Sequence, residues 1–481
     1  MMPFAVVKGV TTPEITLKAD ANFACDAPTP LLCPDPTPWP SQCALIVSAV
    51  TLAMAIHVNA GTLAPRAIAL LSVSIVALFA VPFLPARRPV RVGGVSLPHL
   101  LLGLGVLAQF LAILRPVMQM TTRSTFDELI PLLVSIGFAL IATSLLFLKN
   151  RLCAALAFPC VIAAYLVCGM WAFYQVPLPV IDVFVFQNDG VAKLLDGANP
   201  YAMRFPDIYT PTKSALYYGP GVSVAGWLQY GYPYAPLTLL AGVPGYLAGD
   251  VRYSNLAAMA VAALLIGYAR PGRISKLAAV LLLFTPPMLL LFANAWTEPF
   301  VIVMLAATWF CHCRRPRYMP WMLGLFLASK QYAILAMPLC LLLLDRPWRI
   351  APLVRMIWRV AAAGLFVSLP LILWDTRAFA HSALLWQFRQ PFRADSLSYL
   401  AWLRPANPLQ WTWVAFAAMF ATMAFVLAIG RRKRLPFPVG VAMLFMMFFA
   451  FNKQAFANYY YFVISALCIA LAEYDTQQRP A

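Results

Sequence analysis

The chain has 481 residues, of which 62% are hydrophobic and 11% are charged, and its formal net charge is +18. Soluble domains have about 45–50% apolar and about 25% charged residues, so this chain cannot cover its apolar surface in water. We expect an all-α polytopic membrane protein. The positive charge does not indicate a nucleic-acid partner, because Lys and Arg stand in short clusters between apolar runs, where membrane lipids and the positive-inside bias place them.

The first 43 residues are rich in proline and predict an extended cytosolic tail. The runs that follow are apolar and approach the length of one membrane crossing. They cover 44–60, 66–84, 97–114, 128–148, 152–171, 234–249, 253–269, 277–294, 299–311, 320–344, 358–374, 409–429, 436–451 and 459–472. We therefore expect about 14 transmembrane helices.

Basic clusters between these runs predict the cytosolic ends of the helices. The clusters lie at 87–91, 149–151, 346–359 and 431–434. They place two long connections, residues 173–233 and 375–408, on the extracytoplasmic face. The even number of runs between the two connections agrees with this placement.

The same count puts two further basic loops, 270–276 and 314–317, on the extracytoplasmic face, against the charge bias. Two interpretations are open. Either one run is miscounted, for example because 320–344 forms two half-crossings around Lys330, or these loops face outward and hold phosphate.

The first long connection holds four of the 17 acidic residues: Asp182, Asp189, Asp196 and Asp207. Asp182 follows a Pro-Leu-Pro turn at the expected membrane edge, where a partly desolvated carboxylate can take a proton from a hydroxyl group. The alternative is an ordinary acid that caps a short amphipathic helix. The other three acids are more typical of solvated or turn positions.

The second long connection mixes aromatic, cationic and hydrogen-bonding side chains over residues 381–398. Arg389 and Arg393 stand four residues apart, and guanidinium groups bind phosphate well because they offer paired donors and stay charged. Pro391 interrupts a helix through both. The alternative for this stretch is an interfacial belt of aromatic residues and arginine.

Ionisable residues within apolar runs are unfavourable and need a reason. Lys330 lies in the middle of a run, and it has three explanations: a lipid phosphate as partner, an internal pair with Glu298, or snorkelling to the interface. Glu298 itself can also simply mark a helix end. Lys453 belongs to a polar and aromatic patch with Asn458 and Tyr459.

Several chemistries are not indicated. The four His residues include no i, i+4 pair, and Cys311-His312-Cys313 is too close-set to form a tetrahedral site alone, so we expect no metal. The scattered cysteines imply no disulfide framework. The lack of a Walker motif in this sequence argues against an ATP-driven transporter.

The first connection resembles that of a known family. Asp182, Leu194-Leu195, Gly197 and Asn199-Pro200-Tyr201, followed by the aromatic and proline-rich stretch 230–236, are similar to the first outer loop of GT-C glycosyltransferases. The resemblance is to the branch of polyprenyl-phosphate-sugar-dependent mannosyltransferases and related bacterial membrane proteins. It covers about residues 152–472, in the order one helix, long outer loop, six helices and second outer loop.

The resemblance implies a domain organisation. It predicts a cytosolic tail (1–43), extra transmembrane helices (44–150), a GT-C-like catalytic module (151–472) and a C-terminal tail (473–481). It also implies a site on the extracytoplasmic side of a bacterial plasma membrane.

For the site, the resemblance implies that Asp182 is the general base. The carrier phosphate would be held by His381, Arg389, Arg393, Lys330 and Lys453. Possible accessory residues are Asp189, Asn199, Tyr201, Glu298, Gln387, Asn458 and Tyr459. The donor would be a polyprenyl-phosphate-linked sugar, with mannose expected, and no metal or other cofactor. The acceptor would be a hydroxyl group of a glycolipid, polysaccharide or protein, and transfer would invert the sugar.

The rival prediction is a secondary transporter or a flippase for lipid-linked sugars. Its support is the many crossings and the intramembrane Lys330. Two long outer loops and the lack of an evident internal repeat in this sequence argue against it. A non-catalytic assembly protein is a third possibility.

Overall fold

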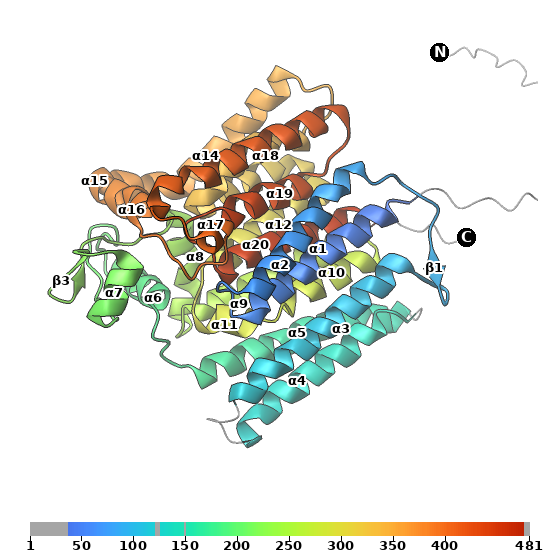
Figure 1. Ribbon diagram of the computed structural model, residues 1–481, viewed down its shortest axis with the longest axis horizontal. Helices are drawn as coiled ribbons and strands as arrows, with labels where there is room; N and C mark the ends of the chain where they lie inside the picture. The colour runs from blue at the N-terminus through green and yellow to red at the C-terminus, as the bar shows by residue number, and fades with distance from the viewer. Residues whose placement is uncertain (1–36, 121–125, 149–150, 476–481) are drawn as a thin grey trace, which may run out of the picture. The chain divides into compact units, whose positions relative to one another are not determined.

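The computed structural model describes residues 37–120, 126–148 and 151–475, so the predictions for 1–36, 149–150 and 476–481 lie outside the described residues. The described chain is almost entirely helical. Its strands are two short hairpins, β1 (Arg91–Val92) with β2 (Val95–Ser96) and β3 (Ser223–Val224) with β4 (Trp227–Leu228). The all-α class is confirmed (Figure 1).

The first ten helices are α1 (Trp39–Val58), α2 (Pro65–Ala80), α3 (Leu97–Met120), α4 (Phe126–Leu145), α5 (Arg151–Gln175), α6 (Asp182–Leu195), α7 (Pro211–Tyr218), α8 (Pro236–Leu247), α9 (Arg252–Ala269) and α10 (Arg273–Leu283). The next ten are α11 (Met288–Ala293), α12 (Glu298–Arg314), α13 (Met319–Ser329), α14 (Ile350–Trp374), α15 (Thr376–Phe379), α16 (Trp386–Arg389), α17 (Tyr399–Leu403), α18 (Trp413–Arg432), α19 (Phe437–Ala450) and α20 (Ala457–Glu473). Shorter or irregular helices are η1 (Val81–Phe83), η2 (Pro316–Tyr318), η3 (Gln331–Leu343), η4 (Ala380–Leu385) and η5 (Pro408–Trp411).

Within the described residues, seven helices are long and apolar enough to cross a membrane, or eight if the bent pair α8 and α9 counts as one span. The multi-pass class is therefore confirmed, and the expected count of about 14 is not. The difference arises because some apolar runs do not form one straight helix. Run 277–294 divides into α10 and α11, and run 320–344 is broken at Lys330 between α13 and η3.

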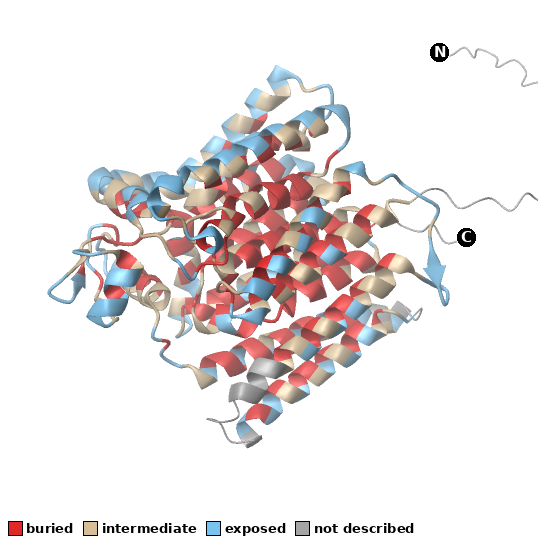
Figure 2. Ribbon diagram, viewed as in Figure 1, coloured by how far each residue is buried: buried red, intermediate tan, exposed pale blue. Residues whose placement is uncertain are grey.

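The described residues belong to one compact unit. Its centre is α20, which packs against α1, α10, α12 and α19. Almost every side chain of α19 and α20 is buried, as expected for helices that are apolar all round (Figure 2). By contrast, α14 exposes large apolar side chains such as Trp358 and Phe366, which is typical of a lipid-facing surface.

Helix α20 defines two opposite ends of this unit, because a helix of 17 residues is about 26 Å long. Just before its start, the backbone of Lys453 and Ala455 accepts hydrogen bonds from the second long connection. Just after its end, Asp475 accepts hydrogen bonds from Ser275, and Glu473 pairs with Arg270. We call the first the loop end and the second the basic end.

The two basic loops that conflicted with the charge bias lie at the basic end. Arg270 reaches Glu473, Arg273 donates to the carbonyls of Phe147 and Leu148, and Arg314 donates to the carbonyl of Tyr268. These loops therefore lie at the opposite end of the unit from the two long connections.

Helix α8 also differs from the expected series of crossings. It meets α9 at an angle of 109°, and Arg252 at the start of α9 donates to the carbonyls of Val176 and Pro177 in the first connection. Its other end follows Pro233, whose carbonyl accepts a hydrogen bond from Gln387 of the second connection. Both ends of α8 thus lie at the loop end, so α8 does not extend from one end of the unit to the other.

The turn between α1 and α2 packs closely on the start of α20, and this contact gives a first prediction. Gly61 has φ +79°, and a Cβ there would lie 2.5 Å from the backbone nitrogen of Ala457. We expect Gly61→Ala to lower the unfolding temperature in detergent, because it adds overpacking of about 1–3 kcal/mol to the cost of its backbone conformation.

The matched control is Gly94→Ala, because Gly94 has φ +81° and no atom within 4 Å of its Cβ position. It measures the backbone cost alone. Equal unfolding temperatures for the two variants would contradict the close contact.

Candidate active site

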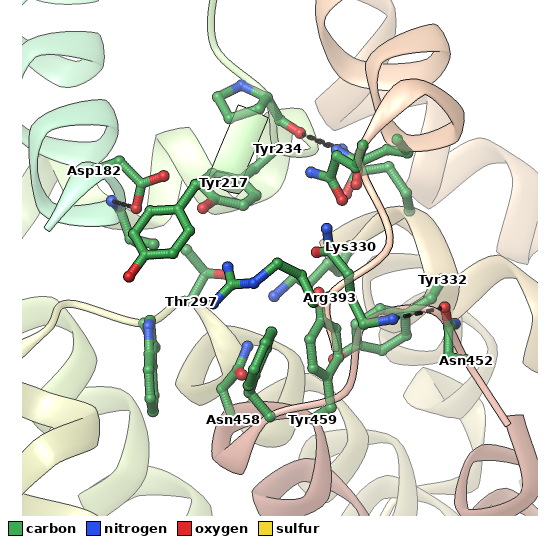
Figure 3. Close-up of a pocket in the computed structure, with 18 of the residues that line it drawn as sticks. Asp182, Tyr217, Tyr234, Thr297, Lys330, Tyr332, Arg393, Asn452, Asn458 and Tyr459 are labelled. Atoms are coloured by element: carbon green, nitrogen blue, oxygen red, sulfur yellow. Dashed lines mark hydrogen bonds between the residues drawn. The ribbon is translucent and has the colours of Figure 1, made fainter. Parts of the chain in front are cut away.

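A cavity of about 940 Å³ opens at the loop end, and residues from both long connections line it (Figure 3). Its polar and charged lining includes Asp182, Lys213, Asn294, Thr297, Glu298, Lys330, Gln331, Gln387, Gln390, Arg393, Asp395, Asn452, Lys453, Gln454 and Asn458. Its apolar lining includes Ile334, Leu335, Leu384, Phe416, Phe448 and Phe449. The cavity can therefore receive a molecule with one polar and one apolar part.

Direct contacts join the two connections around this cavity. The Ser382 hydroxyl accepts a hydrogen bond from the amide of Gly231 at 2.8 Å and donates to the carbonyl of Tyr201 at 3.0 Å. The ring of Trp386 stacks on Tyr230, with 4.0 Å between the ring centroids. The two connections therefore lie beside each other at the loop end.

Asp182 is the first residue of α6 and lies partly buried in the wall of the cavity. Its Oδ2 accepts a hydrogen bond from Tyr218 at 3.1 Å, and its Oδ1 accepts from the amide of Val183 at 2.8 Å and from Tyr209 at 3.4 Å. Ile181 holds the N-cap position, so Asp182 is not the N-cap residue.

The surroundings of Asp182 favour a carboxylate that can accept a proton. Burial raises its pKa above the usual value for aspartate, and the hydrogen bonds from Tyr218, Val183 and Tyr209 reduce this rise because they stabilise the charged form. Arg393 acts in the same direction through its charge. A base with a raised pKa holds a proton more readily after it has removed it from a hydroxyl group.

A buried arginine fixes the start of the first connection. The guanidinium of Arg252 donates to the carbonyl of Val176 at 2.6 Å and to that of Pro177 at 3.1 Å. Asp250 pairs with it, and the ring of Phe173 lies 4.7 Å from its central carbon. Because these bonds hold the turn that leads into α6, they limit where Asp182 can lie. No pattern in the sequence indicated this contact.

Arg393 projects into the middle of the cavity (Figure 3). Its Nε and Nη2 form two bonds to Asp395, at 2.9 and 2.8 Å, which leaves Nη1 for a ligand. Its guanidinium also lies over the rings of Tyr217, at 4.2 Å, and Phe456, at 4.9 Å. These contacts fix the plane of the guanidinium, as binding of a phosphate group requires.

Lys453 lines the same cavity, in the connection between α19 and α20. Its Nζ donates to the carbonyls of Phe388 at 3.0 Å and Gln390 at 2.6 Å. Burial lowers its pKa to about 8. Lys453 thus holds the second connection in place, and its charge is present below about pH 8.

Lys330 forms an ion pair with Glu298, which answers the question of its partner. Lys330 has an extended backbone conformation between α13 and η3. Its side chain lines the cavity. Asn458 donates to the same Glu298 oxygen at 3.0 Å. The rings of Tyr332 and Tyr459 lie 5.5 and 5.6 Å from the ammonium group.

Five predicted site residues do not line this cavity: His381, Arg389, Asp189, Asn199 and Tyr201. Arg389 is exposed, because the chain turns at Gln390 and Pro391 and separates it from Arg393. Tyr201 donates to the carbonyl of Tyr234 at 2.9 Å, and Asn199 accepts from the amide of Tyr201 at 3.0 Å. These two side chains stabilise the first connection.

The remaining predicted residues line the cavity: Asp182, Arg393, Lys330, Lys453, Glu298, Gln387, Asn458 and Tyr459. Sequence reasoning missed the tyrosines beside Asp182, namely Tyr209, Tyr217, Tyr218, Tyr230 and Tyr234. Their only signal was the density of tyrosine between residues 209 and 234.

Within the described ranges, no group of three His, Cys, Asp or Glu side chains is arranged to hold a metal ion. A comparison of the chain with protein-family models, curated proteins and solved structures finds no match.

Proposed function

We propose that this protein is a membrane glycosyltransferase that moves a sugar from a polyprenyl-phosphate carrier to an acceptor hydroxyl group. The observation that carries the proposal is one cavity that holds the desolvated carboxylate of Asp182, the fixed guanidinium of Arg393 and an apolar wall. These three parts match a base, a phosphate site and the start of a lipid chain. The resemblance of the first connection to GT-C enzymes supports the same function.

We further propose that the loop end faces the extracytoplasmic side. The support is the distribution of charge, because the described basic loops at 270–276 and 314–317 lie at the opposite end together with the chain after α20. Short basic loops mark the cytosolic side. Nucleotide sugars are not present on the extracytoplasmic side, which agrees with a lipid-linked donor.

In the proposed reaction, Asp182 takes the proton of the acceptor hydroxyl as its oxygen attacks the anomeric carbon. The bond between that carbon and the carrier phosphate breaks, and the electron pair leaves with the phosphate. Arg393 and Lys453 stabilise the charge that develops there. Attack opposite to the phosphate inverts the sugar. Asp182 then loses its proton to water.

The first test replaces the proposed base. We expect Asp182→Asn to lower transfer of radiolabelled sugar from polyprenyl phosphate to acceptor by about 10²- to 10⁴-fold, the usual contribution of a general base. The control is Asp196→Asn, because Asp196 is an exposed acid in the same connection. Full activity of a folded Asp182→Asn variant would contradict the assignment. Label that only crosses the vesicle membrane, with none on an acceptor, would instead favour a flippase.

The second test uses pH. Removal of the Tyr218 hydroxyl takes away a hydrogen bond that lowers the pKa of Asp182, so Tyr218→Phe raises this pKa further. Activity requires the ionised carboxylate and is lost as pH falls through its pKa. We therefore expect the acidic limb of the kcat/KM profile to move to higher pH in Tyr218→Phe, by about one unit. A shift to lower pH would contradict the role of Asp182.

The third test compares Arg393 with Arg389, which the sequence analysis predicted equally as phosphate ligands. We expect Arg393→Lys to lower kcat/KM for the lipid donor by about tenfold or more, since lysine cannot supply the flat, paired donors of guanidinium. Arg389→Lys should remain close to the wild type, because Arg389 is exposed and does not line the cavity. Equal effects of the two changes would show that the phosphate lies elsewhere.

A further inference from the structure

We infer that the part of the cavity around Glu298 is a subsite for the hydroxyl groups of an uncharged sugar ring. This inference deepens the proposed function and relies on it for the identity of the ligand as a sugar. It rests on three buried oxygen atoms that lack partners and belong to residues lining one cavity, and on the charge balance around them.

The first of these atoms belongs to Glu298, whose side chain is completely buried. Its Oε1 takes the bonds from Lys330 and Asn458. Its Oε2 has no hydrogen-bond partner among the residues that the structure describes. A carboxylate only accepts hydrogen bonds, so Oε2 requires a donor that these residues do not supply.

The other two atoms are hydroxyl oxygens, those of Thr297 and Tyr332. Both are buried and have no partner within the described chain, and both residues line the cavity. Each can donate one hydrogen bond and accept another. An unsatisfied buried polar group is unfavourable, so three on residues that line one cavity favour a ligand that carries several hydroxyl groups. The neighbouring hydroxyls of a sugar ring have this property, because each can donate to Oε2 and accept from a phenol or threonine.

The charges around the subsite select against an anion. Lys330 is already paired with Glu298, so its charge is largely balanced. The free lone pairs of Oε2 repel a phosphate or a sugar carboxylate. This assigns the phosphate to Arg393 and the uncharged ring to Glu298, whereas the sequence alone had offered Lys330 as a phosphate ligand. The aromatic rings of Tyr234 and Tyr459 beside Lys330 can pack against the carbon faces of the ring.

The test measures binding of free glycosides to the full-length protein in lipid nanodiscs, because many detergents carry sugar head groups. Saturation-transfer NMR would use methyl α-D-mannopyranoside and methyl α-D-glucopyranoside as uncharged probes, and methyl α-D-glucopyranosiduronate as the anionic probe. We expect at least one uncharged probe to bind, and the uronate to bind at least tenfold more weakly.

Two isosteric variants then remove single hydroxyl groups, Tyr332→Phe and Thr297→Val. We expect each to weaken binding of the uncharged glycoside about fivefold, the worth of one hydrogen bond of about 1 kcal/mol. The control is Tyr165→Phe, because Tyr165 is fully buried and does not line the cavity. Binding of a polyprenyl phosphate without sugar should be unchanged in all three.

The outcomes distinguish this inference from the proposed function. The subsite is overturned if glycoside binding is unchanged in Tyr332→Phe and Thr297→Val, or if neither uncharged probe binds to the wild type. Either result would show that only water hydrogen-bonds to these oxygens. If transfer then persists, the proposed function stands without the subsite. If the two variants weaken glycoside binding while the wild type transfers no sugar, the subsite stands and the proposed function fails.

Discussion

The contact between the two long connections is the constraint on which the site depends. Asp182 belongs to the first connection and Arg393 to the second, and the stack of Trp386 on Tyr230, together with the bonds of Ser382, holds them around one cavity. Neither connection encloses this space alone. Because the stack and these bonds are buried, a change that separates the connections would remove the site before it affected the helices below.

The helices before residue 150 also support this arrangement. The amide of Leu63, between α1 and α2, donates to the carbonyl of Asp395 at 2.8 Å, and Thr62 forms a β-bridge with Ser396. On the other side, the amide of Leu397 donates to the carbonyl of Ala455 at 2.8 Å. The stretch after Arg393 is thus held between the α1–α2 turn and the start of α20. Helices that the resemblance leaves outside the catalytic module therefore help to fix the second connection.

Sequence reasoning succeeded where a local rule decides the outcome. A lysine within an apolar run needs an anion, and this rule led to Glu298 as one of the candidate partners of Lys330. It failed for α8, because run length alone does not distinguish a helix that crosses from one that stays at one end of the bundle. It also could not predict that Arg393 lines the cavity and Arg389 does not, because the orientation of each side chain depends on the path of the chain at Pro391. The tyrosines beside Asp182 are distant from it in the sequence and contact it only because the whole connection folds back on itself.

The pairing of Arg393 has a consequence for the proposed reaction. A polyprenyl-phosphate sugar carries one negative charge on its phosphate, and the released carrier carries up to two. A guanidinium that already holds Asp395 gains little from the first charge, because a new anion must share its donors. It gains more as the second charge develops. In that case Arg393 would stabilise the transition state more than the bound donor, and only such a difference accelerates the chemical step. The Asp395 carboxylate would then keep the donor from binding too tightly, rather than compete with the reaction.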